Sequence, residues 1–563
     1  MRNLLGKNMP ARITEQQGGL GPARFILVFT AFTLLAYNGP MFVRAFGFLQ
    51  GDNLGHNILL LGLLGMLVVF LQVVFFVLFA LVSLRLMKLF AVLTLILNSA
   101  ALYFILTYGT ALNLNVIRSI FAADITTTAN LLHPKLFMIV LVLGVLPAVV
   151  VMRLRVVRTP RWRLLGLIVA AFLGFINSAY LVSHRWPWDN WFSTEIASLI
   201  TSEVGSMTLP WGYVINTVAY LQQDVFINHD LVLLPDGDFT QTLPAGQRQV
   251  VILVIGESAR AANHSLYGYA RETNPYTRDL DLVALPGAKS CGTYTLAGIA
   301  CMLSHEGDQA QINSGQEALA SYLQRQGVEV IWRTHLSNEP VPKVAEYVRL
   351  KDLREGCTNP NCGLANSESA LLSGLEDRII AADSSRVLVV LHQGFGSHGP
   401  AYYEQYPPEF ERFTPVCETV QVQSCPRQNL INTYDNTMVH TDWFLAQIID
   451  LLDAMADTQS VLIYASDHGE SLGEVSQPES GRGYRLFQHA VAVGSAPPEQ
   501  REIPILVWMS PDFQRARGLT SQEITQGGPF GHGNIFHSVL GAFDFKSPVY
   551  DQGKDIFVPS TAK

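Results

Sequence analysis

The stretch VVILVIGESAR, residues 250–260, decides the fold of the larger part of this chain. Six apolar, mostly β-branched residues are followed directly by a glycine and Glu257. A continuous apolar run of this length is typical of a strand that is buried on both faces of a parallel sheet. Similar runs alternate with helical stretches further along the chain, at 328–332, 386–392, 461–465 and 504–509. The pattern predicts an α/β domain with a sheet covered by helices.

Residues of the types that commonly bind metals follow three of these five runs. In open α/β sheets, ligands sit at the carboxyl ends of the strands. Glu257 follows the first run, and the third is followed by HQGFGSHGP, which carries His392 and His398. The fourth is followed by SDHGES, with Asp467 and His468. One such residue is usually a cap or a satisfied loop side chain, and His392, which ends a strand, reads that way. Together, two carboxylates and an imidazole favour a Zn²⁺ or Mn²⁺ site.

A loop with two cysteines carries the candidate nucleophile. The segment KSCGTYTLAGIACMLS, residues 289–304, holds Thr293 and Thr295 between Cys291 and Cys301. Three protein ligands leave a metal position open, and a hydroxyl there loses its proton more readily. A threonine needs such activation to become a nucleophile. A disulfide between the two cysteines would hold this loop rigid, so that a threonine oxygen meets the metal.

The first third of the chain is much more apolar than the rest. The chain has 563 residues, 49% of them hydrophobic, and a formal net charge of −8, which gives no support to a nucleic-acid partner. A membrane-spanning helix needs about 20 mostly apolar residues. Five runs fit that length, which predicts five transmembrane helices: Phe25–Val43, Asn57–Leu84, Leu89–Leu106, Leu136–Met152 and Leu164–Val182.

Basic residues in the short loops predict the orientation. Eleven lysines and arginines lie on the side of the N-terminus and three on the other: Arg2, Lys7, Arg12, Arg24, Arg85, Lys88, Arg153, Arg155, Arg158, Arg161 and Arg163 against Arg44, Arg118 and Lys135. The positive-inside rule then makes the N-terminus cytoplasmic. Five crossings place everything after about Val182 on the far side.

The cysteines agree with this orientation, because all six lie in the far-side part. An even number in close sequence pairs, on an oxidising side, indicates local disulfides. The simplest of the fifteen pairings joins neighbours in sequence. The alternative is metal binding by thiolates, which is disfavoured because the sequence contains no CxxC pair. The predicted disulfides are Cys291–Cys301, Cys357–Cys362 and Cys417–Cys425.

A segment between the two main parts is expected at the membrane surface. Trp186, Trp188 and Trp191 suggest an aromatic belt, or simply a cap on the helix bundle. The chain to about Asp224 is expected to lie along the membrane, and a polar linker follows. The predicted organisation is a transmembrane domain (1–183), a surface helix and linker (184–248), and a catalytic domain (249–563).

Four motifs carry a family resemblance. GESAR (256–260), the SCGTxT…C loop, GSHGPAYY…YP and SDHGESLGE resemble the phosphoethanolamine transferases of Gram-negative inner membranes. The resemblance covers essentially the whole chain and is closest to the lipid A enzymes, which include the mobile colistin-resistance proteins. It implies five membrane helices followed by a periplasmic domain of the alkaline-phosphatase/sulfatase type.

The resemblance also implies roles for single residues. It makes Glu257, Thr295, Asp467 and His468 the metal ligands, with Thr295 as nucleophile and Thr293 as its nearby competitor. The family's further histidines, which bind a second metal or handle the phosphate and the leaving group, correspond to His398 and His489. At the second of these, the usual His-Gly is replaced by His489-Ala490.

Two stretches depart from the family's pattern. The family's Asn and Glu in the second periplasmic loop, which meet the ethanolamine head group, fall on Ser119 and Thr127 by alignment. Only Asp124 nearby keeps a carboxylate, so head-group recognition is expected to shift to Asp124. The stretch WRTHLSNEPVPK, residues 332–343, lacks the Cys-Lys-Gly-like segment of many relatives.

The implied function is transfer of phosphoethanolamine from phosphatidylethanolamine to lipid A through a covalent threonine intermediate, which would give polymyxin resistance. Zn²⁺ is the expected cofactor, with Mn²⁺ as alternative and the number of metals open, and a monomer is expected. Other acceptors, such as a core sugar or another periplasmic glycan, fit the same core. The rival readings are a phosphoglycerol transferase, a plain hydrolase, and a membrane-anchored binding or sensory protein with an inert site.

Overall fold

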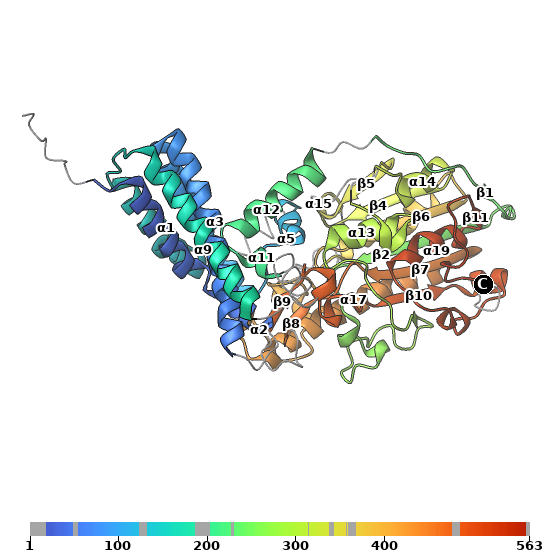
Figure 1. The fold of residues 1–563 in the computed structure, drawn as a ribbon. Coiled ribbons are helices and arrows are strands. Elements are labelled where there is room, and N and C mark those ends of the chain that lie inside the picture. The colour runs from blue at the N-terminus through green and yellow to red at the C-terminus, as the bar shows by residue number, and fades with distance from the viewer. Residues whose placement is uncertain are drawn as a thin grey trace, which may run out of the picture. The chain divides into compact units, whose positions relative to one another are not determined.

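The structure is a computed structural model, and it describes residues 19–48, 54–122, 132–185, 203–226, 230–312, 315–336, 343–355, 357, 367–475 and 485–558. The chain forms two compact units. The first comprises Met1–Tyr103, Lys135–Ala197 and Thr208–Pro210, and the second comprises Phe104–Pro134, Ser198–Met207 and Trp211–Lys563. Each unit is described by itself below, with element labels as in Figure 1.

The first unit consists of apolar helices. Among the described residues, four helical stretches are long and apolar enough to cross a membrane: Asn57–Val82, Leu84–Tyr108, Pro134–Arg153 and Arg161–Leu181. A bent pair of helices makes a fifth if it counts as one span. The fold therefore begins with four to five apolar helices. The elements are α1 (Pro22–Tyr37), α2 (Gly39–Phe48), α3 (Leu54–Val82), α4 (Leu84–Tyr108), α7 (Pro134–Ile139), the π-helical η1 (Val140–Val145), α8 (Leu146–Arg153) and α9 (Arg161–Arg185).

The bent pair owes its geometry to Asn38. Helices α1 and α2 meet there at 57°. The buried Asn38 side chain donates to the carbonyls of Thr33 and Leu209 (3.2 and 3.0 Å) and accepts from the Leu209 amide (2.8 Å). A break in an apolar helix is tolerated only where other groups satisfy the freed backbone polar atoms. Asn38 and Leu209 satisfy one another in this way, so the break is built into the fold.

The second unit is built on a seven-stranded sheet in the order β3-β10-β7-β2-β6-β4-β5. Strands β7, β2, β6, β4 and β5 run parallel to one another, while β10 and β3 run antiparallel at one edge. The sheet is therefore mostly parallel. Its strands are β2 (Arg248–Gly256), β3 (Val283–Ala284), β4 (Glu329–Thr334), β5 (Glu346–Arg349), β6 (Arg386–His392), β7 (Thr458–Ser466) and β10 (Ile505–Met509).

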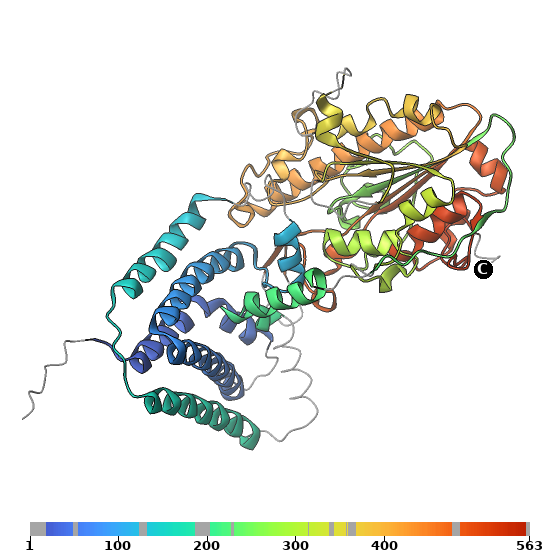
Figure 2. The same cartoon turned by 90° about the horizontal axis from the view of Figure 1, so that it is seen from above.

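The central strand shows why the sheet is covered on both faces. In β2, Val251, Leu253 and Ile255 pack into one hydrophobic cluster with helices α13, α14, α18 and α19. The alternate residues Val250, Ile252 and Val254 pack into a second cluster with α15, α16 and α17. Figure 2 shows these helices on opposite sides of the sheet. The helices are α13 (Thr295–Leu303), α14 (Leu319–Arg325), α15 (Leu350–Glu355), α16 (Leu375–Ile380), α17 (Arg427–Asp453), α18 (Pro511–Arg517) and α19 (Ile535–Ala542).

All five strands predicted from the sequence are present, and the structure adds detail that the sequence did not give. The fifth, β10, is antiparallel to β7, so its carboxyl end lies at the opposite edge from the other four. The short strands β3 and β5 were not predicted. Two small sheets also form, from β1 (Asp238–Phe239) with β11 (Phe545–Lys546) and from β8 (Ser471–Val475) with β9 (Arg485–Gln488).

Two further predictions are tested in part. The disulfides Cys291–Cys301 and Cys417–Cys425 are formed as predicted. The third pair stays a prediction, because Cys362 lies outside the described residues. The three tryptophans expected at a membrane surface also lie outside them. The described part of that segment forms helices α11 (Glu203–Met207) and α12 (Trp211–Tyr220), followed by the π-helical η2 (Leu221–Val225).

Candidate active site

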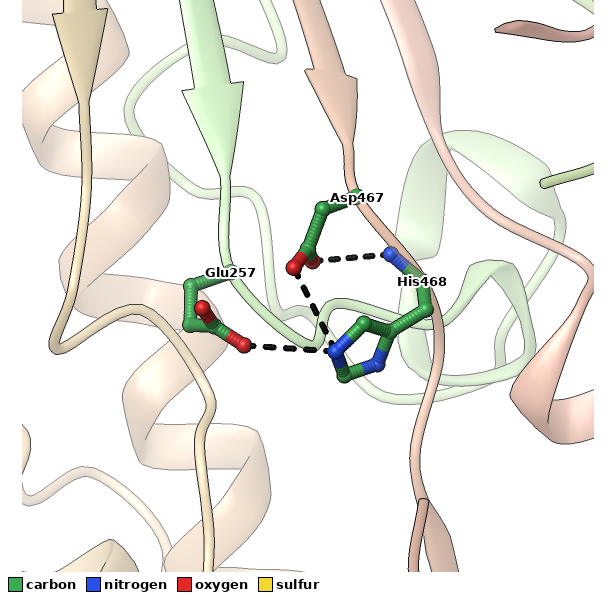
Figure 3. Close-up of side chains that lie close together, drawn as sticks. All are labelled: Glu257, Asp467 and His468. Carbon is green, nitrogen blue, oxygen red and sulfur yellow. Dashed lines mark hydrogen bonds and ion pairs between the residues drawn. The ribbon is translucent and has the colours of Figure 1, made fainter. Parts of the chain in front are cut away.

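The carboxyl ends of the two central strands bring the first candidate ligands together. Strands β2 and β7 are paired in register through Gly256 and Ser466, and the Asp467 amide donates to the Gly256 carbonyl at 2.9 Å. Glu257 and Asp467 therefore leave adjacent strands at the same level. Figure 3 shows His468 turned toward both carboxylates. One ligand atom from each of the three residues lies within 4.8 Å of the others.

The donor set fits a cation. The Asp467 Oδ1 atom accepts from the backbone amides of Ser258 and His468 (2.9 and 2.8 Å). Its Oδ2 atom is buried without a hydrogen-bond partner among the described residues. Buried carboxylates are stable when they are paired or bind a metal. Because the three side chains are almost completely buried, a divalent cation is the partner that would satisfy them together.

The tautomer of His468 points to the same conclusion. Its Nδ1 atom lies 2.8 Å from the Gly469 carbonyl and must donate to it. The lone pair is then on Nε2, which lies 3.3 Å from Asp467 Oδ2 and 3.5 Å from Glu257 Oε1. Metal-binding histidines commonly donate their other ring N–H to a carbonyl in this way. A lone pair facing two carboxylates is favourable only with positive charge between them.

The pKa of Glu257 also indicates that negative charge at this site lacks a positive partner. Burial, and then the charge of Asp467, raise the pKa of the Glu257 carboxyl well above its ordinary value. The Ser258 hydroxyl opposes this by donating to Glu257 Oε1 at 2.7 Å. A bound cation would favour the charged form and reverse the shift.

The backbone around Glu257 is shaped to hold it. Ser258 has a positive φ of 57°, which is uncommon for a residue with a side chain and aims its amide at Asp467. Gly396 has a φ of 42°, and a Cβ atom there would lie 2.6 Å from the Glu257 carbonyl oxygen. The Ser397 amide donates to that oxygen at 2.8 Å. The loop after β6 therefore fits closely over Glu257 because residue 396 is a glycine.

The two candidate threonines have different environments. The Thr295 hydroxyl donates to Glu257 Oε2 at 3.3 Å and lies 3.5 Å from His468 Nε2. The Thr293 hydroxyl is completely buried and donates to the Val491 carbonyl at 2.6 Å. Thr295 is also the first residue of α13, and helix N-termini favour bound anions such as phosphate. Of the two hydroxyls, that of Thr295 is the one placed beside the carboxylates and the imidazole.

Two further histidines surround this centre. The His489 ring lies 4.3 Å from the His468 ring and 5.0 Å from the His398 ring, centroid to centroid. Burial lowers the pKa of His398 and of His489 to about 4 in each case. Both imidazoles are therefore neutral near pH 7 and can bind a metal or exchange protons through their ring nitrogens.

Comparisons with known proteins bear on what this site does. Residues 249–545 match the sulfatase family model, and residues 67–225 match the model described as phosphoethanolamine transferase EptA/EptB. Phosphoethanolamine transferase EptA of Helicobacter pylori is 33% identical over 85% of this chain and 87% of its own length. The chain belongs to the phosphoethanolamine transferase family.

Two more members of this phosphoethanolamine transferase family are informative. The phosphatidylethanolamine transferase Mcr-1 of Escherichia coli is 32% identical over 74% of this chain and 77% of its own length. The solved structure of an integral membrane lipooligosaccharide phosphoethanolamine transferase A from Neisseria meningitidis superimposes with a TM-score of 0.81 at 27% identity. It covers 96% of this chain and 99% of that one. The likeness extends over both units, so this phosphoethanolamine transferase is an enzyme with a membrane part and a sulfatase-like part.

The structure brings together most of the predicted site residues of this phosphoethanolamine transferase. Glu257, Asp467, His468 and Thr295 are in contact, and His398 and His489 lie beside them. His392 is a fully buried residue of β6, as expected for a strand residue. The Ser119 hydroxyl donates to the Asn115 carbonyl of its own helix at 3.0 Å. Asp124 and Thr127 lie outside the described residues, so head-group recognition by Asp124 stays a prediction.

One carboxylate near the histidines was missed by sequence reasoning. Glu470 is fully buried, its Oε2 atom lies 3.3 Å from His489 Nδ1, and it accepts from the Gly399 amide at 3.4 Å. Burial raises the pKa of Glu470 to about 7. Glu470 was visible in the SDHGES motif, but it meets His489 only because Glu470 directly precedes β8 and His489 directly follows its partner strand β9. This strand pairing was not predicted from the sequence.

Proposed function

We propose that this chain transfers phosphoethanolamine from phosphatidylethanolamine to a phosphate group of lipid A, through a covalent adduct on Thr295. The observation that carries the proposal is the position of the Thr295 hydroxyl against Glu257 and His468, in a chain of this family. The family relatives support the transferred group, and the lipooligosaccharide named for the Neisseria protein supports the acceptor class.

In the first half-reaction, the Thr295 oxygen attacks the phosphorus of phosphatidylethanolamine. A bond forms between that oxygen and phosphorus, and the bond from phosphorus to the glycerol oxygen breaks. One proton moves from the threonine hydroxyl to the departing oxygen, so that diacylglycerol leaves. His398 and His489 are the side chains that we expect to handle this proton, since both are neutral and adjacent to the centre.

In the second half-reaction, a phosphate oxygen of lipid A attacks the phosphorus of the adduct. The bond to Thr295 breaks, the threonine oxygen takes up the proton that the attacking phosphate group of lipid A gives up, and the phosphoethanolamine group is now attached to lipid A. The enzyme passes through a covalent intermediate and should show ping-pong kinetics. The histidine pair serves both directions of proton movement, as the two half-reactions are formally the reverse of one another.

Glu257, Asp467, His468 and the Thr295 oxygen are the residues that would hold the metal. A bound zinc ion supplies positive charge that lowers the pKa of a neighbouring hydroxyl and neutralises phosphoryl oxygens. Two carboxylates with one imidazole also suit Mn²⁺. His398 and His489 with Glu470 beside them are the place where a second ion would bind.

We further propose that the enzyme lies in the bacterial inner membrane with five crossings and its catalytic part in the periplasm. The excess of basic residues on the N-terminal side supports this orientation, and so do the two disulfides. The proposed domains are 1–183, 184–248 and 249–563, in a monomer. Donor and acceptor are both lipids, which accounts for the membrane part. Added ammonium groups would lower the negative surface charge and weaken binding of polymyxin.

The experiment that tests the proposal compares Thr295→Ala with Thr293→Ala in the full-length protein in detergent, with a fluorescent phosphatidylethanolamine analogue. Loss of the nucleophile should lower the rate of diacylglycerol release by at least about 1,000-fold. Thr293→Ala removes a buried hydrogen bond and should cost only about 1 kcal/mol of stability. Undiminished release by Thr295→Ala would refute the assignment. The mass of lipid A from cells with and without the enzyme identifies the acceptor.

A further inference from the structure

A short segment of the second unit, remote in sequence from the sulfatase-like fold, contacts both sides of the proposed site. It comprises residues 110–122 and includes helix α5 (Leu114–Ala122). Arg118 Nη1 donates to the hydroxyl of Tyr294 at 3.1 Å, and Asn113 Nδ2 donates to the carbonyl of Ala490 at 3.0 Å. Tyr294 directly precedes Thr295, and Ala490 directly follows His489. The segment thus touches the immediate chain neighbours of two proposed site residues.

Arg118 is itself held firmly. Its Nε atom donates to both carboxylate oxygens of Asp224, at 3.2 and 3.0 Å, and its Nη2 atom donates to Gln223 at 3.2 Å. The side chains of Arg118 and Asp224 are only 14% and 5% exposed. A guanidinium is planar and its donors have fixed directions. Once Asp224 and Gln223 fix two of its nitrogens, the third is aimed at Tyr294.

Asp224 and Gln223, which hold Arg118, belong to η2, and the preceding helix α12 packs against the segment that contains α5. Asn216 of α12 donates to the Leu112 carbonyl at 2.9 Å, and the rings of Phe121 and Tyr220 stack with centroids 4.7 Å apart. Figure 1 labels α5 and α12 next to one another in the second unit. We call residues 110–122 and 211–225 together the brace. Because its two parts are joined by several contacts, the brace can act as a rigid support.

Tyr294 is the residue through which such a support reaches the nucleophile. It is the N-cap residue of α13, its carbonyl accepts from the amides of Ala297 and Gly298 (3.1 and 3.2 Å), and its side chain is 4% exposed. The backbone of Tyr294 therefore begins the first turn of α13, directly before Thr295. A shift of its buried ring would be passed through this backbone to that turn, and with it to the Thr295 oxygen.

We infer that Arg118 is a positioning residue of the transferase: by holding the Tyr294 hydroxyl, it keeps the Thr295 oxygen aligned with Glu257 and His468. Asn113 supports the neighbouring His489 in the same way through Ala490. The inference rests on the proposed role of Thr295 as nucleophile. It means that the alignment of the site depends on the connection between two apolar helices, α4 and α7, as well as on the sulfatase-like domain.

The contacts favour this role over direct binding of a lipid phosphate. Three nitrogens of Arg118 already donate to side chains of the protein, and a carboxylate neutralises its charge. A phosphate would have to displace Asp224 first. A small displacement of a reacting atom, about 1 Å, can cost roughly 100-fold in rate, so support of the Tyr294 ring is a sufficient reason for this arrangement.

The decisive variant is Tyr294→Phe, which keeps the packed ring and removes only the hydroxyl. Arg118→Met, Arg118→Lys and the double variant Arg118→Met/Tyr294→Phe complete the set, in full-length protein in detergent with the fluorescent phosphatidylethanolamine analogue. We expect kcat for diacylglycerol release to fall roughly 10- to 100-fold in each single variant, with KM changed by less than about twofold. Arg118→Lys should not restore the rate, because an ammonium cannot make the forked contacts.

The double variant separates positioning from independent effects. If Arg118 acts through Tyr294, the double variant should be no slower than the slower single variant, whereas independent contributions would multiply. The matched control is Arg378→Met. That arginine also joins two carboxylates, Glu329 and Glu346, at 2.5 and 2.8 Å, but at the amino ends of β4 and β5, away from the site. Its removal should leave kcat unchanged.

The inference would be overturned by a wild-type kcat for Tyr294→Phe, by multiplying effects in the double variant, or by an equal fall of kcat in Arg378→Met. Metal content, measured on every variant, should match the wild type, since a positioning role leaves the metal ligands unchanged. A fall in metal content for Tyr294→Phe would also contradict the inference. Failure of the proposed function is recognised separately, because Thr295→Ala would then retain full diacylglycerol release whatever the Arg118 variants do.

Discussion

At the scale of single residues, the site depends on places where a side chain is missing. Gly298 lies in α13, and a Cβ atom at this position would overlap the carbonyl oxygen of Asp467. Helix α13 can therefore approach the end of β7 closely enough to place Thr295 beside His468 only because residue 298 is a glycine. Gly396 plays the same part for the loop that covers Glu257.

Replacing Gly298 with alanine should displace α13 from Asp467. We expect metal affinity and transfer rate both to fall, each by roughly 10- to 100-fold, as for changes that disturb groups orienting metal ligands. Metal content by elemental analysis and the rate of diacylglycerol release are the measurements. Gly494→Ala is the matched control, because a Cβ atom there meets nothing within 4 Å. Normal metal content and rate in Gly298→Ala would contradict this account of the site.

At the scale of elements, the loop after β6 is anchored by a buried carboxylate. Glu368 Oε1 accepts from His335 Nδ1 (2.9 Å) and from the amides of Gly394 and Phe395 (2.6 and 3.0 Å). Burial by itself would raise the pKa of Glu368, but these donors outweigh it and hold the pKa below its ordinary value. The loop that carries His398 and covers Glu257 is thus tied to the ionised form of Glu368.

This pairing predicts a defined pH dependence of stability. An acid whose pKa is lowered by folding stabilises the folded state above its unfolded pKa, about 4.3 for glutamate, and this contribution is lost as pH falls through the folded pKa. Glu368→Gln should therefore lower the unfolding midpoint most near pH 7, by an amount corresponding to about 1–3 kcal/mol. The gap between variant and wild type should narrow below about pH 4.

Thermal unfolding of the full-length protein in detergent, followed by tryptophan fluorescence from pH 7 to pH 3.5, measures that gap. The exposed Glu376→Gln, in α16, serves as the control and should follow the wild type at every pH. A gap that stays constant or widens on acidification would show that the charge of Glu368 does not hold this loop.

The sequence was informative about elements wherever burial was complete. Strands such as β2, β6 and β7 were predictable because strands covered on both faces must be apolar throughout. The proximity of Glu257, Asp467 and His468 was predictable because residues directly after a strand end have little choice of position. The direction of β10 was not predictable, because an apolar run has the same pattern in a parallel and in an antiparallel strand. The pair Arg118–Tyr294 joins residues that are far apart in sequence, and only tertiary packing brings them together. The pair Glu470–His489 depends on the pairing of β8 with β9, which the sequence did not reveal.

At the scale of the whole molecule, the number of membrane crossings in the first unit determines the side of the membrane on which the second unit lies. The described residues contain four to five apolar helices, and the difference between these counts decides on which side the second unit lies. With the proposed cytoplasmic N-terminus, an odd number of crossings would place it in the periplasm, where the two proposed lipid substrates would meet and disulfides persist. The bend at Asn38 fits a single broken crossing, because its polar atoms are satisfied by Leu209 within the same unit.

Reporter fusions test this topology. Alkaline phosphatase fused after Lys563 should be active, because it works in the periplasm. Green fluorescent protein fused there should be dark, because it fluoresces only in the cytoplasm. The same reporters placed in the loop between Arg153 and Arg161 should give the reverse result, because its basic residues favour the cytoplasm. Fluorescence from the C-terminal fusion would mean an even number of crossings. The second unit would then lie in the cytoplasm, on the other side of the membrane from its proposed substrates.

The central claim is that the Thr295 oxygen carries the phosphoethanolamine group between donor and acceptor. The most direct measurement incubates the enzyme with phosphatidylethanolamine in the absence of lipid A, stops the reaction with acid, and locates the modification by peptide mass spectrometry. The account predicts one phosphoethanolamine group on Thr295, removed when lipid A is added before the stop. A glycerol phosphate group, a modification on another residue, or no adduct while diacylglycerol is released would contradict it.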